Sequence, residues 1–414
     1  MSPGVSITGA AQVLRPPEDG LAFMRHDRAG ELSAEPGSVA FEGDRIAGFE
    51  PDPTAVWQID AQGCAVIPGF VDCHTHLPFA GWRAEEYEMK VTGVPYEEIA
   101  RAGGGIRASA RALARASDDA ILAQARALAA EMLAHGTTTF EGKSGYGLSV
   151  EAELRLLGLA GRLAEGVPQP TATTALLAHA VPDGYDADGW MEAVAAMVPE
   201  VARATRATAL DIYVESIGFT NQHLRRMGEL ASAHGLDLRT HVEQFNSHRS
   251  IPVALEVGAR SVDHLSCLHP DDIGPLAAAD CAAVLLPGAE FMGNEHVPPA
   301  RELVEAGALC VLATDANPGT SPIVSMPLVI GLAVRRYGWN VLEALLAATL
   351  NAAWVLRAST DTGSLEVGKR ADILLLDGPL EHIPYRLGHN PVAIAFLGGE
   401  PVWVRPDCAW RVAG

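Results

Sequence analysis

Two histidines separated by one residue, His74 and His76, stand at the end of an apolar run that starts at Val66. Residues two apart in a β-strand share a face, so both imidazoles are predicted to point the same way. Two imidazoles side by side are typical of a metal site, although an ordinary polar strand end would look the same. The remaining ligands must come from other parts of the chain.

Candidate polar residues also follow six of the seven later apolar runs of the chain, and only the run that begins at Cys281 has none. They are Lys143 and Tyr146, His179, Glu215, His241 and Gln244, Asp263 and His264, and Asp315 and Asn317. The candidate metal ligands among them and the first pair are His74, His76, His241 and Asp315. Nitrogen and carboxylate ligands that leave a position for water are typical of catalytic metal centres, and they suit Zn²⁺ or Fe²⁺. Because a metal lowers the pKa of bound water towards about 7, the set predicts a hydrolase.

Further residues are candidates for proton transfer and for holding an anion. The Asp315 carboxylate would accept a proton from the water, and His264 would stabilise an oxyanion or lead the proton to the leaving group. Arg83, in the loop after the histidine pair, has donors that match a substrate carboxylate, unless it is an exposed arginine without a role. Backbone amides around Gly319 and Thr320 predict a cradle for an anionic group, with a plain Pro-Gly turn as the alternative.

Eight β-like runs that alternate with Ala-rich helical segments would position these residues. The runs are CAVIPGFVDCHTH, GTTTFEGKSGYG, TATTALLAHAVP, ALDIYVESIGF, LDLRTHVEQF, ARSVDHLSC, CAAVLLPGAEF and ALCVLATDANPG. Such alternation predicts an α/β fold in which a parallel sheet closes into a (β/α)₈ barrel of the TIM type. Barrel active sites form at the carboxyl ends of the strands, so the candidate residues are expected to converge.

The two ends of the chain differ from the middle. Residues 1–64 and 361–414 contain alternating runs and turns, whereas residues 65–360 hold the strand and helix alternation. We expect the two terminal segments to pair into one small discontinuous β-sandwich beside the catalytic barrel.

Composition restricts the partners. The chain has 414 residues and a formal net charge of −21, and its basic residues are scattered, which argues against nucleic acid or an anionic membrane surface as a partner. The N-terminal segment has no signal-peptide pattern, and the six cysteines show no C-x-x-C spacing, so we expect reduced cysteines and a cytoplasmic location. A homodimer is expected from the general frequency of homo-oligomers.

Several blocks between about residue 64 and residue 400 resemble the imidazolonepropionase family of the amidohydrolase superfamily. The blocks include DCHTHLPFAGWRAEEYEMKVTGVPYEEIARAGGGI, EGKSGYGLSVEAELRLL, AHAVP, THVEQF, LATDANPGTSP and GSLEVGKRADILLLD. The resemblance implies one divalent metal ion, Zn²⁺ or Fe²⁺, on the four candidate ligands. It also implies hydrolysis of the ring amide C–N bond of 4-imidazolone-5-propanoate, a small anionic cyclic amide, to N-formimino-L-glutamate in histidine degradation.

The resemblance further implies roles for particular side chains. Substrate contacts are implied for Arg83, Tyr146, His179, Gln244, Asn317, Gly319 and Thr320, and catalytic roles for His264, Asp315 and Gln244. Many related amidohydrolases carry a glutamate at the position of Gln244, and an amide cannot shuttle protons as that carboxylate does. Two alternatives remain: a related amidohydrolase that acts on another small cyclic amide or amidine, and a catalytically silent barrel used for assembly or ligand binding.

Overall fold

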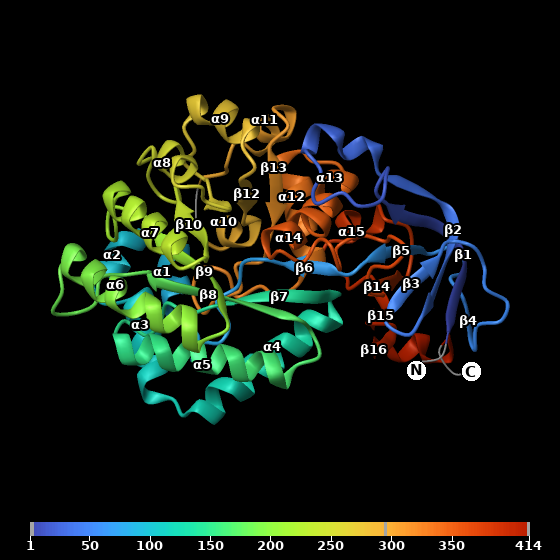
Figure 1. The fold of residues 1–414 in the computed structure, drawn as a ribbon, viewed down its shortest axis with the longest axis horizontal. Helices are drawn as coiled ribbons and strands as arrows, with labels where there is room; N and C mark the ends of the chain where they lie inside the picture. Colours follow the sequence, from blue (N-terminus) through green and yellow to red (C-terminus); the bar gives the residue numbers. More distant parts are fainter. Residues whose placement is uncertain (1–3, 294–295, 412–414) are drawn as a thin grey trace.

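The computed structural model describes residues 4–293 and 296–411. Figure 1 shows a rounded barrel surrounded by helices and, beside it, a β-rich region where both termini lie. The barrel strands are, in spatial and chain order, β6 (Phe70–Asp72), β7 (Thr137–Lys143), β8 (Thr171–Ala178), β9 (Ala207–Tyr213), β10 (Asp237–Val242), β11 (Ser261–His264), β12 (Ala282–Leu285) and β13 (Leu309–Leu312). Every neighbouring pair in this order is parallel, which confirms the predicted barrel.

Contacts between the first and last strands close the barrel. A parallel bridge joins Thr75, just after β6, to Ala316, just after β13. The His76 N–H donates to the Ala316 carbonyl at 2.9 Å, and the Asp315 N–H donates to the His74 carbonyl at 3.0 Å. Closure therefore places the candidate ligands that follow the first strand, β6, beside the candidate ligand that follows the last strand, β13.

Helices cover the outside of the barrel (Figure 1). The helices of the structure are α1 (Ala84–Val91), α2 (Tyr96–Arg101), α3 (Ile106–Arg115), α4 (Asp118–Ala134), α5 (Val150–Gly166), α6 (Ala187–Ala204), α7 (Asn221–Ala233), α8 (Ser250–Glu256), α9 (Ile273–Ala278), α10 (Pro287–Gly293), α11 (Ala300–Glu305), α12 (Met326–Tyr337), α13 (Val341–Ala347), α14 (Leu350–Val355) and α15 (His382–Tyr385). In α4, the Ser117 side chain caps the first turn, and Ile121, Ala125 and Met132 form a buried stripe at helical spacing. Side-chain caps of the same kind begin α5 (Ser149), α6 (Asp186), α12 (Ser325) and α13 (Asn340), and each of these helices also buries apolar residues.

The two ends of the chain share one mixed sheet. Its strands are β1 (Val5–Arg15), β2 (Ser33–Glu42), β3 (Arg45–Gly48), β4 (Trp57–Asp60), β5 (Ala65–Pro68), β14 (Ile373–Leu376), β15 (Val392–Leu397) and β16 (Glu400–Val404). Strand β5 joins the two segments, because it pairs in parallel with β1 and antiparallel with β14. Gly69 then links β5 to β6, and a Cβ at that position would lie 2.0 Å from Thr138 Oγ1. The division at residues 64 and 360 remains our proposal for the domain boundaries.

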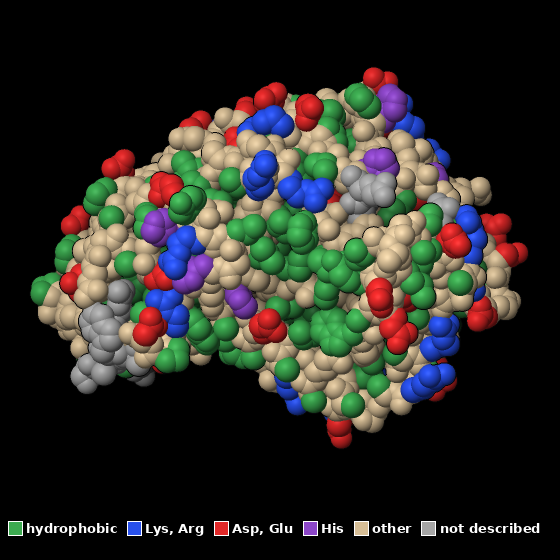
Figure 2. Space-filling view, turned by 180° about the vertical axis from the view of Figure 1, so that it is seen from behind, with side chains coloured by type: hydrophobic (Ala, Val, Ile, Leu, Met, Phe, Trp, Pro, Cys, Tyr) green, Lys and Arg blue, Asp and Glu red, His purple; other side chains and the backbone are tan. Residues whose placement is uncertain are grey.

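The surface carries no helix suited to a bilayer: within the described ranges, none is both long and apolar enough to span one. On the face shown in Figure 2, Lys and Arg side chains stand in several separate places among acidic and hydrophobic ones. That face therefore presents no continuous basic surface, as the net charge of −21 leads one to expect.

Candidate active site

The four predicted metal ligands meet at the carboxyl end of the barrel. Asp315 Oδ1 lies 3.2 Å from His76 Nε2 and 3.5 Å from His74 Nε2. The His74 and His241 rings have centroids 4.5 Å apart. Ligand atoms of His74, His76 and Asp315 all lie within 4.8 Å of one another, and those of His74, His241 and His264 form a second such group. The structure therefore brings the predicted ligands together and places His264 directly beside them.

The donor atoms of this group fit a divalent cation. His74 Nε2, His241 Nε2 and Asp315 Oδ1 are buried and have no hydrogen-bond partner among the described residues. The opposite ring nitrogens are occupied, since His74 Nδ1 lies 2.6 Å from Asp263 Oδ2 and His241 Nδ1 lies 3.0 Å from Asp211 Oδ1. A carboxylate accepts hydrogen bonds, so each Nδ1 carries a proton and each Nε2 presents a lone pair. Buried polar atoms without partners are rare, and a bound cation would satisfy all three.

A buried network of charged side chains holds these histidines. Lys143 Nζ lies 2.8 Å from Asp211 and 2.9 Å from Glu141. The Arg239 guanidinium lies 2.6 Å from Glu141 and 3.1 Å from Asp263. These side chains are 0% to 1% exposed. Each buried charge faces an opposite charge, which offsets the free-energy cost of removing it from water. Its two aspartates are the groups that orient His74 and His241.

Burial also sets the charge of the imidazoles. It lowers the pKa of His74, His76 and His179 well below the ordinary value, and it lowers the pKa of His264 to about 3. These rings are therefore neutral at pH 7 and can act as metal ligands or as hydrogen-bonding groups. Burial raises the pKa of Asp315, and a bound cation would oppose that shift.

Arg83 brings a positive charge into the same cavity. It immediately precedes α1 and is 9% exposed. Its Nε lies 3.6 Å from Glu86 Oε2, while Nε and Nη1 have no hydrogen-bond partner in the part of the chain that the structure describes. Gly319 packs so closely that a Cβ there would lie 1.7 Å from Arg83 Nη2. A buried guanidinium with unused donors is suited to an anionic ligand.

The loop after β13 differs from the expected anion cradle. The N–H groups of Gly319 and Thr320 both donate to Asn317 Oδ1 at 2.8 Å. The Asn317 side chain also donates to Thr320 Oγ1 at 2.8 Å. These backbone amides are therefore engaged within the loop, because an Asn side chain can replace an external anion as their acceptor. Gly319 instead supports Arg83, and Asn317 and Thr320 reach the cavity with their side chains.

One cavity connects the metal-ligand group to Arg83. Ten of the predicted site residues line it: His76, Arg83, Tyr146, His179, His241, Gln244, His264, Asp315, Asn317 and Thr320. Two predicted residues are not part of this lining. His74 lies in the ligand group, and Gly319 lies against the Arg83 guanidinium.

Sequence reasoning missed two sets of residues around the cavity. Ile106, Tyr213 and Phe245 line the wall. Glu141, Asp211 and Arg239 form most of the charged network. The sequence holds a signal for the second set. Each member lies on a strand and shares a face with a residue two positions later, near the carboxyl end of that strand: Lys143, Tyr213 and His241 respectively. Charged residues on the inward face of a buried strand need partners, and those partners are here the groups that hold the ligands.

Glu215 has a supporting position rather than a place on the cavity wall. Its Oε2 accepts from the N–H groups of Phe245 at 3.0 Å and Asn246 at 3.2 Å, and its Oε1 lies 2.9 Å from His248 Nε2. The loop that presents Gln244 is thus held to the end of β9 by a carboxylate that is 3% exposed.

The comparisons with known proteins identify the family. The model of the amidohydrolase family matches residues 65–402. The chain belongs to the amidohydrolase family. The structure also resembles an adenosine deaminase from Xanthomonas campestris with bound zinc, at 18% identity and a TM-score of 0.70 over 99% of this chain and 96% of that one. A triazine hydrolase variant gives 17% identity and a TM-score of 0.75 over 97% and 95%. At such identities the likeness concerns the fold alone.

Curated relatives at higher identity carry a more specific name. The imidazolonepropionase of Rubrobacter xylanophilus is 42% identical over 389 residues, which cover 91% of this chain and 93% of the relative. That of Caulobacter vibrioides is 42% identical over 90% of this chain and 95% of the relative. That of Deinococcus radiodurans is 41% identical over 95% and 98%. The similarity therefore spans both the barrel and most of the terminal sheet.

Proposed function

We propose that the chain hydrolyses the ring amide C–N bond of 4-imidazolone-5-propanoate and releases N-formimino-L-glutamate, a step of histidine degradation. The observation that carries the proposal is one cavity that joins a His and Asp group fit for a cation to a buried guanidinium with unused donors. The curated relatives named imidazolonepropionase, at 42% and 41% identity, support it.

One divalent cation, Zn²⁺ or Fe²⁺, would be held by His74, His76, His241 and Asp315. When bound, it supplies a hydroxide at neutral pH and polarises the ring carbonyl. Asp315 accepts the proton that the attacking water loses. As the water oxygen joins the carbonyl carbon, the neutral His264 ring stabilises the developing oxyanion with its N–H. The ring C–N bond then breaks, and the leaving nitrogen takes up the proton that Asp315 accepted.

The other cavity residues bind and orient the substrate. Arg83 pairs with the propionate carboxylate, because a guanidinium matches a carboxylate with two parallel N–H donors. Tyr146 and His179 stand against His76, with ring centroids 5.7 and 5.3 Å away, and bracket the imidazolone ring. Gln244 contributes an amide that can hydrogen-bond the ring without changing protonation state. Asn317 and Thr320 complete the end of the cavity beside Arg83, and Gly319 packs against the Arg83 guanidinium.

Incubation of the purified protein with 4-imidazolone-5-propanoate tests the proposal. We expect formiminoglutamate to appear, with one equivalent of bound metal found by elemental analysis. A ring that lacks the propionate, such as hydantoin, should react far more slowly, because it leaves Arg83 without a partner. Turnover of hydantoin but not of the propionate substrate would instead support action on another cyclic amide. A cytoplasmic location and a homodimer remain part of the proposal, and size-exclusion chromatography with light scattering tests the dimer.

A further inference from the structure

The loop between β7 and α5 is wrapped around a buried carboxylate. Glu153, in the first turn of α5, is 1% exposed. Its Oε2 accepts the N–H of Gly145 at 2.9 Å, and its Oε1 accepts the N–H groups of Gly147 at 2.6 Å and Leu148 at 3.1 Å. The helix does not need Glu153 as its cap, because the Ser149 side chain already accepts from Ala152 N. Glu153 therefore binds the loop rather than the helix end.

Two glycines of this loop allow close approaches, Gly147 to Glu153 and Gly145 to His179. A Cβ at Gly147 would lie 2.5 Å from Glu153 N and 2.8 Å from Glu153 Oε1. Gly145 has a φ of 113°, which side-chain-bearing residues rarely adopt. A Cβ at Gly145 would also lie 2.9 Å from His179 Nδ1. The backbone is thus confined between the carboxylate on one side and the His179 ring on the other.

Two residues of the cavity wall depend on this loop. Tyr146 lies between the anchored residues Gly145 and Gly147 and lines the cavity. His179 Nδ1 lies 3.0 Å from the Gly145 carbonyl oxygen. A carbonyl can only accept, so Nδ1 is the protonated nitrogen, and Nε2 of the neutral ring is left as a hydrogen-bond acceptor. The Tyr146 and His179 rings lie 5.3 Å apart, centroid to centroid.

We propose that Glu153 is a positioning residue, which acts through the backbone of residues 145–148 to fix Tyr146 and to hold His179 in its acceptor tautomer. The substrate feature selected in this way is an N–H donor on the ring, which an imidazolone has. This inference rests on the proposed function, because it assumes that Tyr146 and His179 contact the substrate. Burial raises the pKa of Glu153, and the hydrogen bonds to its carboxylate, which include those from the three backbone N–H groups, oppose that effect.

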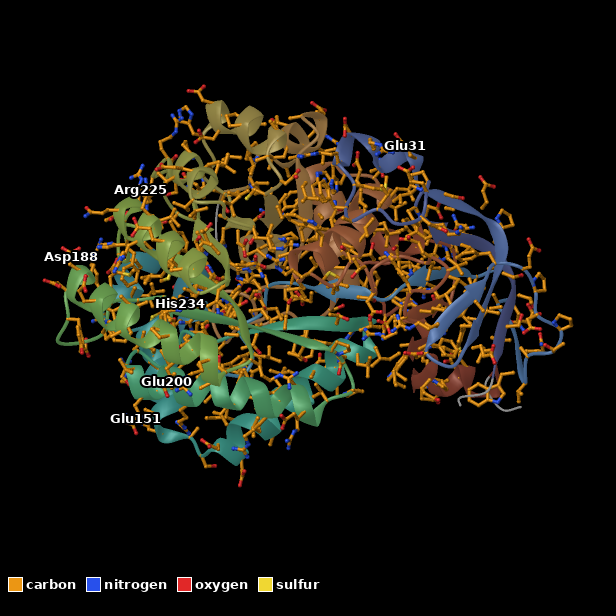
Figure 3. The ribbon with its side chains drawn as sticks, in the orientation of Figure 1. Glu31, Glu151, Asp188, Glu200, Arg225 and His234 are labelled. Carbon is orange, nitrogen blue, oxygen red and sulfur yellow. The ribbon has the colours of Figure 1, made fainter. Side chains whose placement is uncertain are left out.

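Replacement of Glu153 by glutamine tests the inference, with Glu151→Gln as the matched control. Glu151 lies two residues earlier on the same helix and is exposed (Figure 3). The glutamine amide nitrogen donates, so Glu153→Gln replaces an acceptor with a donor that faces a backbone N–H. We expect kcat/KM to fall at least tenfold, with unchanged metal content, and hydrogen exchange of the 145–148 amides to accelerate at least tenfold. Glu151→Gln should match the wild type in all three measurements.

A combined variant separates positioning from a general structural effect. If Glu153 acts through Tyr146 and His179, adding Glu153→Gln to a protein that already carries Tyr146→Ala and His179→Ala should lower kcat/KM no further than about twofold. If the combined variant instead loses as much kcat/KM as the product of the separate losses, the inference is overturned, because Glu153 then affects turnover by another route. Unchanged kcat/KM or unchanged exchange in the single variant would also overturn it.

Two further outcomes keep the inference distinct from the proposed function. If the wild type does not hydrolyse 4-imidazolone-5-propanoate, the proposed function fails, and the exchange experiment alone decides whether Glu153 holds the loop. If Glu153→Gln does not fold, Glu153→Asp replaces it. Aspartate keeps the charge but withdraws the carboxylate by about 1.5 Å, one C–C bond, from the loop amides. Wild-type exchange and kinetics in that variant would overturn the inference.

Discussion

Replacement of Asp211 by asparagine tests whether the buried charged network orients the metal ligands. Asparagine keeps the shape of the side chain but is neutral, and its amide nitrogen donates. The two carboxylate oxygens face His241 Nδ1 at 3.0 Å and Lys143 Nζ at 2.8 Å, and both of these atoms are donors. Whichever way the amide turns, one of the two contacts places a donor against a donor.

The structure allows the size of the effect to be estimated. Removing a group that orients a metal-bound histidine typically weakens metal binding about 10- to 100-fold, which corresponds to about 1.4 to 2.8 kcal/mol. Removing one partner of a buried ion pair destabilises the fold by about 3 to 5 kcal/mol. Lys143 retains Glu141 at 2.9 Å, so we expect a loss of unfolding free energy near the lower end, about 3 kcal/mol.

Chelator competition and urea unfolding of the same samples measure the two effects. Asp188→Asn is the matched control, since Asp188 Oδ1 also lies 2.9 Å from a histidine nitrogen, His223 Nε2, but its side chain is 87% exposed (Figure 3). We expect the control to change stability by less than about 1 kcal/mol and metal affinity not at all. If Asp211→Asn bound metal as tightly as the control variant, the network would not orient His241.

Other substitutions test the anion-binding end and the helices behind the site. Arg83→Lys should raise KM at least tenfold at unchanged metal content, because one ammonium replaces a two-pronged contact; an unchanged KM would remove Arg83 from the site. Gly319→Ala should have a similar effect in steady-state kinetics, since its Cβ would lie 1.7 Å from that guanidinium, and wild-type kinetics would contradict the packing. Burial raises the pKa of Glu290 from 4.5 to about 7, although Tyr337 and Arg336 lower it. Between pH 4.5 and about 7 the folded protein keeps a proton on Glu290 that the unfolded protein releases. The contribution of Glu290 to the free energy of unfolding is therefore fully present below pH 4.5 and is lost as pH rises through about 7. The shift corresponds to about 3 kcal/mol, and urea unfolding at pH 5 and pH 8 should show a smaller pH dependence in Glu290→Gln; equal dependence would refute the assignment.

Local patterns explain what the sequence could predict. The barrel follows from strand and helix alternation, and the convergence of His74, His241 and Asp315 follows from the rule that barrel sites form at strand ends. His74 and His76 were predicted to share a face because strand geometry has a period of two. None of these inferences needs knowledge of which distant atoms touch.

The remaining features depend on long-range contacts that no local pattern encodes. The capture of the Gly319 and Thr320 amides by Asn317 is an example, since the same residues could equally have bound an external anion. The support of Arg83 by Gly319 joins positions that are far apart in the chain. The pairing of β5 with both β1 and β14 is likewise set by packing and not by the strand sequences themselves.

The charges inside the barrel give a physical reason for a divalent cation. The ion-paired network contains two cations, Lys143 and Arg239, and three carboxylates, Glu141, Asp211 and Asp263, and the ligand group adds the carboxylate of Asp315. Arg83 lies outside this network and faces Glu86 at 3.6 Å. With neutral imidazoles, the formal charges leave two negative charges in excess. Burying uncompensated charge is costly, and burial indeed raises the pKa of both Asp263 and Asp315. One divalent cation would neutralise the excess, whereas a monovalent cation would leave half of it, so the network favours a double charge before any ligand geometry is considered.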